Sequence, residues 1–482
     1  MTLYVLLGLP LLAFVVSAAA PRSRHLPAGA TVVGASVALA LAARAAVGVA
    51  LGAPLVGIAG WLSLDGLGAL VLLVVALVGA CAALFSLGYM GRHHGETGRT
   101  RSYYLQLDLF LFSLLLVPMA SEPILAWIAV ELTALLSVFL VGFESTHAAL
   151  EAAWKYIVMM FMGAAIALLG FLLLFWACTL SGGAYSWEGL RAAAPRLSPA
   201  LVEGAFLLIL VGFGTKVGLV PLHTWLPDAH SESPSVISAL LSGALLNCAF
   251  LGILRSYQIC AAAGQSEFCR DLLVLFGLMS IGWATVFILG QTDYKRMLAY
   301  SSVEHVGILA LGVGIGAGAT FGAMLHAVNH SLTKAMLFMA AGNILAVYKT
   351  KTTTEVRGVL RVLPVTGVLW IAGFVAITGM PPFGMFVSEF TLLRAMIKQG
   401  KIGIAVAFLA MLALIFVGMS VAFLNMAQGK ADKEPHLNGK SESVFAVLPP
   451  MVLGALTLML GLYIPTAVKE LLHGVAAAIG GY

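Results

Sequence analysis

The sequence predicts an all-α polytopic membrane protein with about fourteen transmembrane helices. Of its 482 residues, 61% are hydrophobic and only 10% are charged, whereas a soluble domain carries about 25% charged residues. So few polar side chains could not cover a soluble surface, and the lipid bilayer must therefore be the solvent. Recurring apolar segments and two proline-containing interruptions support the same fold class.

Apolar segments long enough to cross a bilayer recur along the whole chain. A helix needs roughly 20 residues to span the hydrocarbon core. The segments of that length are residues 1–20, 28–51, 64–90, 102–120, 123–143, 154–181, 202–226, 235–258, 271–291, 297–317, 320–347, 362–396, 402–427 and 444–466. The first has no basic stretch before its apolar run, so we interpret it as a membrane helix and not as a signal peptide.

Basic residues are distributed unevenly between the two sets of loops. The loops that follow the odd-numbered segments hold 15 of the 26 Lys and Arg residues, and the opposite loops hold nine. Because Lys and Arg keep short loops in the cytoplasm, we expect both termini to face outward. The fifteen residues are Arg22, Arg24, Arg92, Arg99, Arg101, Lys155, Lys295, Arg296, Lys349, Lys351, Arg357, Arg361, Lys430, Lys433 and Lys440. The net charge of +5 therefore requires no nucleic-acid partner.

The sequence lacks the usual patterns of metal and nucleotide sites. Its five cysteines form no CxxC pair and no cluster with histidine, which argues against an iron–sulfur or zinc site. Cys260 and Cys269 share an outward loop, where either a disulfide or two free thiols would fit. The glycine-rich run from Gly312 follows a membrane segment and not a strand, so a turn is expected there and not a phosphate-binding loop.

Charged residues within the apolar segments are the first candidates for function. Five stand out: Glu131, Lys216, Glu304, Lys334 and Glu389. A charge near the bilayer centre costs about 2.5–3.5 kcal/mol on insertion scales, so such residues either carry ions through a hydrated interior or pair structurally. We expect Glu131 and Lys216 to pair, and a paired carboxylate and ammonium can hold a movable proton; a purely structural pair is the alternative.

Two other charged residues need no function. Asp108 and Lys155 lie near predicted helix ends, where long side chains can extend to the membrane surface.

Histidines form a second group of candidates because histidine titrates near neutral pH. His223, His230 and His305 lie in or close to predicted helices. His326 and His330 precede Lys334 at four-residue steps, so the three share one helix face. This polar stripe within an apolar helix favours a hydrated path over isolated interhelical hydrogen bonds.

Prolines interrupt two of the segments in similar surroundings. Pro221 lies in "FGTKVGLVPLHTWLPDAH", and Pro381 and Pro382 lie in "GFVAITGMPPFGMFVSEF". Proline removes a backbone donor, and freed carbonyls at membrane depth are tolerated where they are buried or line a water-filled cavity. Two broken helices in corresponding positions are typical of transporters built from paired repeats.

These motifs together resemble a known family. "ELTALLSVFLVGF", "GTKVGLVPLHTWLPDAHSESPSVISALLSGALL", "DYKRMLAYSSVEHVGI" and "HAVNHSLTKAMLF" are similar to the antiporter-like, proton-translocating subunits of respiratory complex I, cation/proton antiporters and membrane-bound hydrogenases. The resemblance covers roughly residues 60–425, and "SSVEHVGI" is most like the hydrogenase-4 component F branch.

The resemblance implies a domain organisation. It implies fourteen helices with two inverted five-helix repeats, in which helices 7 and 12 are broken. Residues 1–100 would hold helices 1–3, residues 101–260 the first repeat (helices 4–8), residues 268–428 the second repeat (helices 9–13) and residues 440–482 helix 14.

The resemblance also implies roles for individual residues. Glu131 matches the glutamate of helix 5, Lys216 the lysine of helix 7, and Glu389 the charged position on broken helix 12. Asn247 stands where many relatives carry a lysine in helix 8, so we expect it only to order water. The implied proton relay comprises Glu131, Lys216, His223, Glu304, His305, His326, His330, Lys334 and Glu389.

The resemblance implies a non-redox, proton-pumping subunit of an oxidoreductase complex with no cofactor and no metal in this chain. Its partners would be other membrane subunits and a peripheral iron–sulfur arm, joined in the hydrogenase branch by a nickel–iron subunit. Its location would be the cytoplasmic membrane of a bacterium or archaeon, with periplasmic termini. The alternatives are a Na⁺/proton antiporter or bicarbonate-uptake subunit, a stand-alone secondary transporter, and a scaffold without transport.

Overall fold

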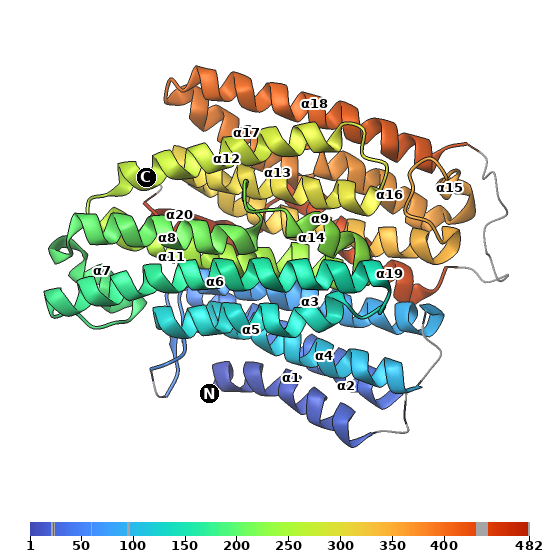
Figure 1. The fold of residues 1–482 in the computed structure, drawn as a ribbon, viewed down its shortest axis with the longest axis horizontal. Coiled ribbons are helices and arrows are strands. Elements are labelled where there is room, and N and C mark those ends of the chain that lie inside the picture. The colour runs from blue at the N-terminus through green and yellow to red at the C-terminus, as the bar shows by residue number, and fades with distance from the viewer. Residues whose placement is uncertain (21–22, 24, 59, 94–96, 430–441, 481–482) are drawn as a thin grey trace.

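The computed structural model describes residues 1–20, 23, 25–58, 60–93, 97–429 and 442–480. Long helices lie side by side in one bundle, and most of them run along its long axis (Figure 1). The elements up to the middle of the chain are α1 (Thr2–Ala19), α2 (His25–Ala50), β1 (Leu55–Val56), β2 (Ser63–Leu64), α3 (Gly66–His93), α4 (Thr97–Leu116), η1 (Val117–Met119), α5 (Pro123–Val141), α6 (His147–Ser181), α7 (Trp187–Ala193), η2 (Ala194–Arg196), α8 (Pro199–Val217), α9 (Trp225–Glu232) and α10 (Ser235–Leu240).

The remaining elements complete the bundle. They are the π-helical turn η3 (Leu241–Leu245), α11 (Leu246–Ala262), α12 (Ser266–Ile288), α13 (Tyr294–Ile315), α14 (Gly318–Tyr348), α15 (Val359–Val362), α16 (Pro364–Ile377), α17 (Gly384–Lys398), α18 (Ile402–Ala427), α19 (Val444–Leu462) and α20 (Thr466–Ala478). β1 and β2 form a short antiparallel hairpin between α2 and α3.

The predicted transmembrane segments are confirmed. Among the described residues, thirteen helices are long and apolar enough to cross a membrane, with α10, η3 and α11 counted together as Ser235–Ala262. The predicted segment 362–396 divides into α16 and α17, which together make the fourteenth crossing. α6 begins before the predicted start at residue 154 because the Thr146 side chain accepts a hydrogen bond from the Ala149 amide and caps the helix.

Both predicted helix breaks are present. α8 ends at Gly218, whose φ of +86° suits glycine, and α9 resumes after Pro221. α16 ends before Gly379, which also has a positive φ, and α17 resumes after Pro382. Each break contains a cis peptide bond before its proline. α8 alone is long and apolar enough to cross a membrane, and the first break and α9 follow it.

Side chains satisfy the backbone groups that the first break exposes. Ser280 Oγ of α12 accepts a hydrogen bond from the Val220 amide at 3.0 Å. The Trp225 indole donates to the Thr215 carbonyl at 2.7 Å. Irregular backbone at membrane depth is stable when it is buried in protein in this way.

α1 begins and α20 ends toward the same side of the bundle, as an even number of crossings requires (Figure 1). Which membrane face this is remains a prediction, and so do the boundaries of the two repeats. α20 was not predicted. It is a short helix that follows the last crossing, buries Leu471, Leu472 and Val475, and packs against α14, α2 and α3.

Two charged residues are more buried than we expected. Asp108 lies within α4 and is 1% exposed, so its predicted position near a helix end is wrong. Lys295, which we counted among the loop cations, is buried at the start of α13. Its ammonium donates to the carbonyl oxygens of Ser231 and Ser233 at 3.1 and 2.7 Å. The end of α9 leaves carbonyls without helical partners, and Lys295 satisfies two of the carbonyls at that turn.

Other sequence-based expectations fit the structure better. Lys155 is 48% exposed and forms ion pairs with Glu151 and Asp228. Cys260 and Cys269 are buried free thiols, but they lie within α11 and α12 and not in a shared loop, so that predicted location is wrong. The predicted cytoplasmic cations Arg22, Arg24, Lys430, Lys433 and Lys440 lie outside the described residues.

Candidate functional site in the membrane interior

Glu131 and Lys216 form a buried ion pair, as the sequence predicts. Glu131 projects from α5 and Lys216 from the last turn of α8, and Lys216 Nζ lies 2.8 Å from Glu131 Oε1. The Lys216 side chain is 1% exposed. Apart from this pairing, neither charged group has a hydrogen-bond partner among the described residues. Each charge therefore depends on the other, and removing one would leave a buried charge uncompensated.

Aromatic side chains surround the end of α8 that carries Lys216. The Trp225 indole donates to the carbonyl of Thr215, the residue before Lys216. The Trp225 and Tyr156 rings lie 5.0 Å apart between their centroids, and the Tyr156 hydroxyl shares a 2.7 Å hydrogen bond with Ser137 on α5. α5, α6, α8 and α9 are thereby joined around the ion pair.

A cleft of about 420 Å³ lies between α6 and α9 and reaches Trp225. Its lining also includes Lys155 and Asp228, which form an ion pair at 3.0 Å. Arg296 of α13 forms a second ion pair with Asp228. One indole ring, that of Trp225, thus separates this charged cleft from the backbone beside Lys216.

A second polar cluster joins α13, α14 and α17. His305 Nδ1 lies 3.1 Å from His326 Nε2, and His326 Nδ1 lies 3.0 Å from Ser388 Oγ. On the opposite side of the His305 ring, Nε2 lies 4.0 Å from Glu304 Oε2. All four side chains are buried. Hydrogen bonds join His305, His326 and Ser388 in a row, and Glu304 lies beyond hydrogen-bond distance at its other end.

Hydrogen bonding assigns the proton on each ring when both histidines are neutral. Ser388 Oγ donates to the Met385 carbonyl at 2.7 Å, so it accepts from His326 Nδ1–H. His326 Nε2 then carries no proton and accepts from His305 Nδ1–H. His305 Nε2 is therefore also unprotonated, and it faces Glu304. The row can accept a proton at the Glu304 end and release one at the Ser388 end.

Glu389 completes this cluster from α17. One ring nitrogen of His305, one ring nitrogen of His326 and one carboxylate oxygen of Glu389 lie within 4.8 Å of one another. Two imidazoles and a carboxylate could also hold a transition metal, so a metal would bind at the same atoms that can exchange protons. Gly379, with a φ of +65°, lies directly against the Glu389 carboxylate, where any side chain at position 379 would collide.

Lys334 lies one turn beyond His330 on α14 and is held by backbone. Its ammonium donates to the Leu298 carbonyl at 2.7 Å. Ser302 donates to the same carbonyl at 3.2 Å and shares a 2.8 Å hydrogen bond with Ser242. Ser242 belongs to the π-helical turn η3, a type of distortion that is frequent at functional sites. The eighth crossing is thereby linked to Lys334 through polar groups.

Two buried histidines have unused hydrogen-bonding capacity. Neither ring nitrogen of His330 or of His230 has a partner among the described residues. The His330 ring lies 5.5 Å from that of His305, and the His230 ring of α9 stacks on Phe338 of α14 at 4.9 Å. Their ring nitrogens therefore remain able to bind water.

Two predicted residues lie apart from these clusters. His223 follows the first break and packs against the rings of Trp283 and Tyr300, at 5.8 and 6.4 Å between centroids. Asn247 of α11 donates to the Gly243 carbonyl at 3.2 Å and to Ser331 Oγ at 2.6 Å. Because both amide protons have protein acceptors, only the carbonyl oxygen of Asn247 remains to order water.

Comparison with known proteins identifies the family. The family described as NADH:quinone oxidoreductase/Mrp antiporter, TM matches residues 120–415, which is more than half of the chain and contains every predicted relay residue. The chain belongs to this antiporter-like family. A second family, described as NADH-ubiquinone oxidoreductase (complex I), chain 5 N-terminus, matches residues 59–101.

Individual members of the antiporter-like family support this assignment. The hydrogenase-4 component F homolog of Methylacidiphilum infernorum is 36% identical over 420 residues, which cover 84% of this chain and 86% of that protein. Hydrogenase-4 component B of Escherichia coli is 29% identical over 71% of this chain, and the match spans only 52% of that longer protein.

Solved structures share the fold. A chain of the membrane-bound sulfane sulfur reductase, an archaeal respiratory membrane complex, superimposes with a TM-score of 0.87 at 23% identity and covers 99% of this chain and 97% of its own length. A chain of the Mrp complex from Dietzia sp. gives the same TM-score at 21% identity, with 99% and 96% coverage. Both are chains of membrane complexes, and at these identities they show that this member of the antiporter-like family shares their fold.

Several polar residues of this antiporter-like protein were not among the predicted relay residues. Ser388, Ser302 and Ser242 were missed because a serine in an apolar helix is too common to single out. His230 was noticed as a helix-associated histidine but not selected. Its spacing from Lys216 gave no sign that α9 turns it toward α14, where its ring stacks on Phe338.

Proposed function

We propose that this chain is the proton-translocating membrane subunit of a larger redox-driven complex. The observation that carries the proposal is the row Glu304–His305–His326–Ser388, whose hydrogen bonds assign an uptake end and a release end. Membership of the antiporter-like family supports the proposal. In this proposal the chain itself only binds and transfers protons.

The proposed route begins at the cleft between α6 and α9. Protons reach the Glu131–Lys216 pair past Trp225, which lines the cleft. From there bound water would carry them to Lys334 and Glu304, because Ser302 and Lys334 both donate to the Leu298 carbonyl, which cannot itself pass a proton. Proton transfer through bound water and hydrogen-bonded groups can bridge steps that direct contacts do not.

The second half of the route leads out of the membrane. Glu304 supplies His305 Nε2. Ser388 accepts the Nδ1 proton of His326 as its own hydroxyl proton turns from the Met385 carbonyl and passes to Glu389 beside the second helix break. His330 and His230 lie beside the row and can buffer its charge. His223 lies apart from this route, and its ring packs against Trp283 and Tyr300.

We further propose the setting in which this subunit works. The subunit would lie in a bacterial or archaeal cytoplasmic membrane with periplasmic termini, and the excess of basic residues in one set of loops supports this orientation. Electron transfer would belong to partner subunits with iron–sulfur clusters and, in a hydrogenase-type complex, a nickel–iron centre. The similarity to a hydrogenase-4 component F homolog supports this partner set. Metal analysis of the purified subunit should find no equivalent of iron, nickel, zinc or haem.

A Na⁺/proton antiporter subunit is the second candidate. The observation in its favour is the fold shared with the Mrp complex chain, whose TM-score equals that of the respiratory complex chain. Sodium-dependent proton flux without any electron donor would favour this candidate. Proton flux that requires an electron donor would favour the redox-driven complex.

The test uses the native complex reconstituted into vesicles. Ser388→Ala removes the acceptor of the His326 proton, and we expect proton flux to fall roughly tenfold because a lost buried hydrogen bond costs about 1–2 kcal/mol. Ser420→Ala is the matched control, since Ser420 makes the same bond to a carbonyl three residues earlier but lies exposed on α18. Equal flux in the two variants would contradict the proposed row.

A further inference from the structure

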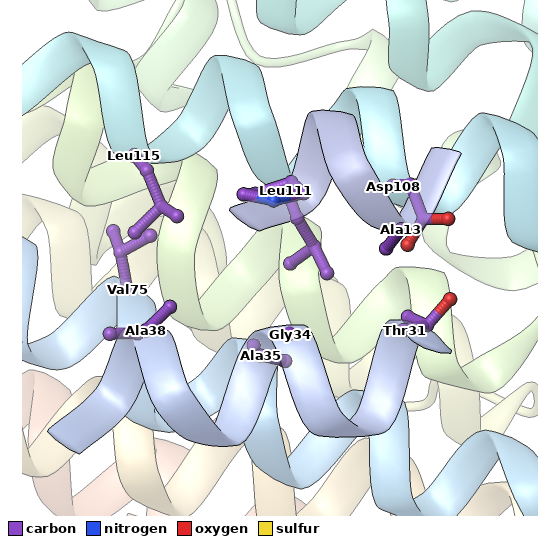
Figure 2. A pocket seen from close by; sticks show the side chains of 12 residues that line it. Ala13, Thr31, Gly34, Ala35, Ala38, Val75, Asp108, Leu111 and Leu115 are labelled. Atoms are coloured by element: carbon purple, nitrogen blue, oxygen red, sulfur yellow. The ribbon is translucent and has the colours of Figure 1, made fainter. Parts of the chain in front are cut away.

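Asp108 is a buried carboxyl group that the proposed route does not use. It lies on α4, where α1, α2 and α3 pack around it, and it is 1% exposed. Figure 2 shows it at one end of a seam of small residues, with Thr31 of α2 and Ala13 of α1 beside it and Leu115 and Val75 at the other end. A carboxyl group at this depth is costly and is by default a functional candidate.

Hydrogen bonding around Asp108 is incomplete. Ser17 Oγ of α1 donates to Asp108 Oδ2 at 3.3 Å, whereas Asp108 Oδ1 has no hydrogen-bond partner among the described residues. The Thr31 hydroxyl lies near the carboxyl group and has two possible acceptors for its single proton, the Pro27 carbonyl at 3.0 Å and Asp108. When Thr31 donates to Pro27, its oxygen lone pairs face the carboxyl group. A proton or another cation between the two groups then satisfies both.

Among the described residues, no charged side chain supplies that cation. The Arg101 guanidinium donates to the Ser17 and Ala18 carbonyls at 3.0 and 2.6 Å, so it is committed to the end of α1. The residues of α1, α2 and α3 that line the seam are apolar apart from Thr31. Among the described residues, Asp108 has no ion pair, and an isolated carboxylate here would pay the full cost of burial.

We propose that Asp108, Ser17 and Thr31 form a binding site for one monovalent cation, either a proton carried by the carboxyl group or Na⁺. Carboxylate and hydroxyl oxygens are the ligands that hard cations prefer. The site comes from α1, α2 and α4 and shares no residue with the proposed proton route. It therefore stands whether or not that route is correct.

The test is labelling of the complete protein in membranes with dicyclohexylcarbodiimide, which modifies protonated carboxyl groups in apolar surroundings. Peptide mass mapping distinguishes Asp108 from the glutamates of the main route. We expect Asp108 to be labelled at neutral pH and labelling to be absent in Asp108→Asn. Several-fold protection by Na⁺, weakened in Thr31→Val, would identify Na⁺ as the ligand, and labelling without protection would identify the proton.

A matched control and a second measurement keep the test decisive. Thr179→Val removes a hydroxyl with the same backbone bond four residues back, but on an exposed face of α6, and should leave Asp108 labelling unchanged. Infrared difference spectroscopy should show a protonated carboxyl band that disappears in Asp108→Asn. The proposal is overturned if Asp108 is unlabelled and the band is absent at neutral pH without Na⁺.

Discussion

A buried ammonium needs a counter-charge, and Lys216 finds it in Glu131 at 2.8 Å. The pairing is tight enough to be structural, but the Trp225 indole bonded next to Lys216 also lines a charged cleft from which a proton could come. What separates the two roles is the effect of removing one partner while the fold persists.

We expect Glu131→Gln and Lys216→Ala to leave the complex assembled and to depress proton flux strongly. Each change strands a buried charge, which typically costs about 3–5 kcal/mol of stability, so the charge-matched double variant should unfold at a higher temperature than either single variant. Thermal unfolding and vesicle proton uptake measure the two effects separately. Normal pumping by both single variants would reduce the pair to a structural contact.

Asn247 and the stripe on α14 should differ in importance. Asn247→Ala removes hydrogen bonds to Gly243 and Ser331 worth about 1–2 kcal/mol, and it should slow transport modestly. His330→Ala and Lys334→Ala remove titratable groups and should slow it far more. Proton flux in the three reconstituted variants is the comparison, and the reverse order of effects would show that the route is wrong.

At the scale of elements, the two broken helices bring backbone turns to the same depth as the charged side chains. The second break places Gly379 against the Glu389 carboxylate. The break thus determines where the last acid of the proposed route can lie.

Gly379→Ala should displace Glu389 and reduce proton flux. Alanine adds a methyl group where the carboxylate lies and is strained at a φ of +65°. Gly400→Ala is the matched control, because Gly400 also has a positive φ but open space around it. Both variants should lose similar backbone stability, measured by thermal unfolding, and only Gly379→Ala should lose flux. Equal flux in both would contradict this role for the second break.

Asp65, between the β1–β2 hairpin and α3, forms a pH-dependent ion pair with Arg255. Burial alone would raise the pKa of Asp65, but hydrogen bonds and charge from Arg255 hold the pKa of this carboxyl below its usual range. A lowered pKa in the folded state stabilises the fold above the unfolded-state pKa of about 4, and that stabilisation is lost as the pH falls below it.

Asp65→Asn should therefore destabilise the protein at neutral pH and matter less in acid. The loss should be smaller than the about 3–5 kcal/mol of a fully buried pair, since the Asp65 side chain is 36% exposed. Thermal unfolding of both proteins between neutral pH and pH of about 3 measures the difference. A difference that does not shrink in acid would assign the effect to packing and not to charge.

At the scale of the whole molecule, the sequence predicted the crossings well because apolar length is a property of each segment alone. The Glu131–Lys216 pair was predictable for a similar reason: two opposite charges in apolar helices need each other. Asp108 was misjudged because its burial depends on how α1 and α2 fold over α4. The proton assignments of His305 and His326 depend on Ser388, which lies 62 residues from His326 along the chain.

Topology can be tested with single cysteines in the intact membrane. A cysteine at Gln399, in the loop between α17 and α18, should react with an impermeant reagent from the periplasmic side. A cysteine at Ser145, between α5 and α6, should react only from the cytoplasmic side, and a reporter near Lys433 should behave as cytoplasmic. Labelling of Ser145→Cys from outside would reverse the predicted orientation.

The assigned tautomers of His305 and His326 have one more consequence. When a proton enters at His305 Nε2 and another leaves from His326 Nδ1, each ring ends with its proton on the opposite nitrogen. The row then points the wrong way and cannot conduct again until both rings reorient or the protons return. The row can therefore move one proton and must return to its starting tautomers before it moves another. This requirement limits passive proton leak. A motion of a partner subunit that permits the rings to reorient would set the number of protons moved per cycle.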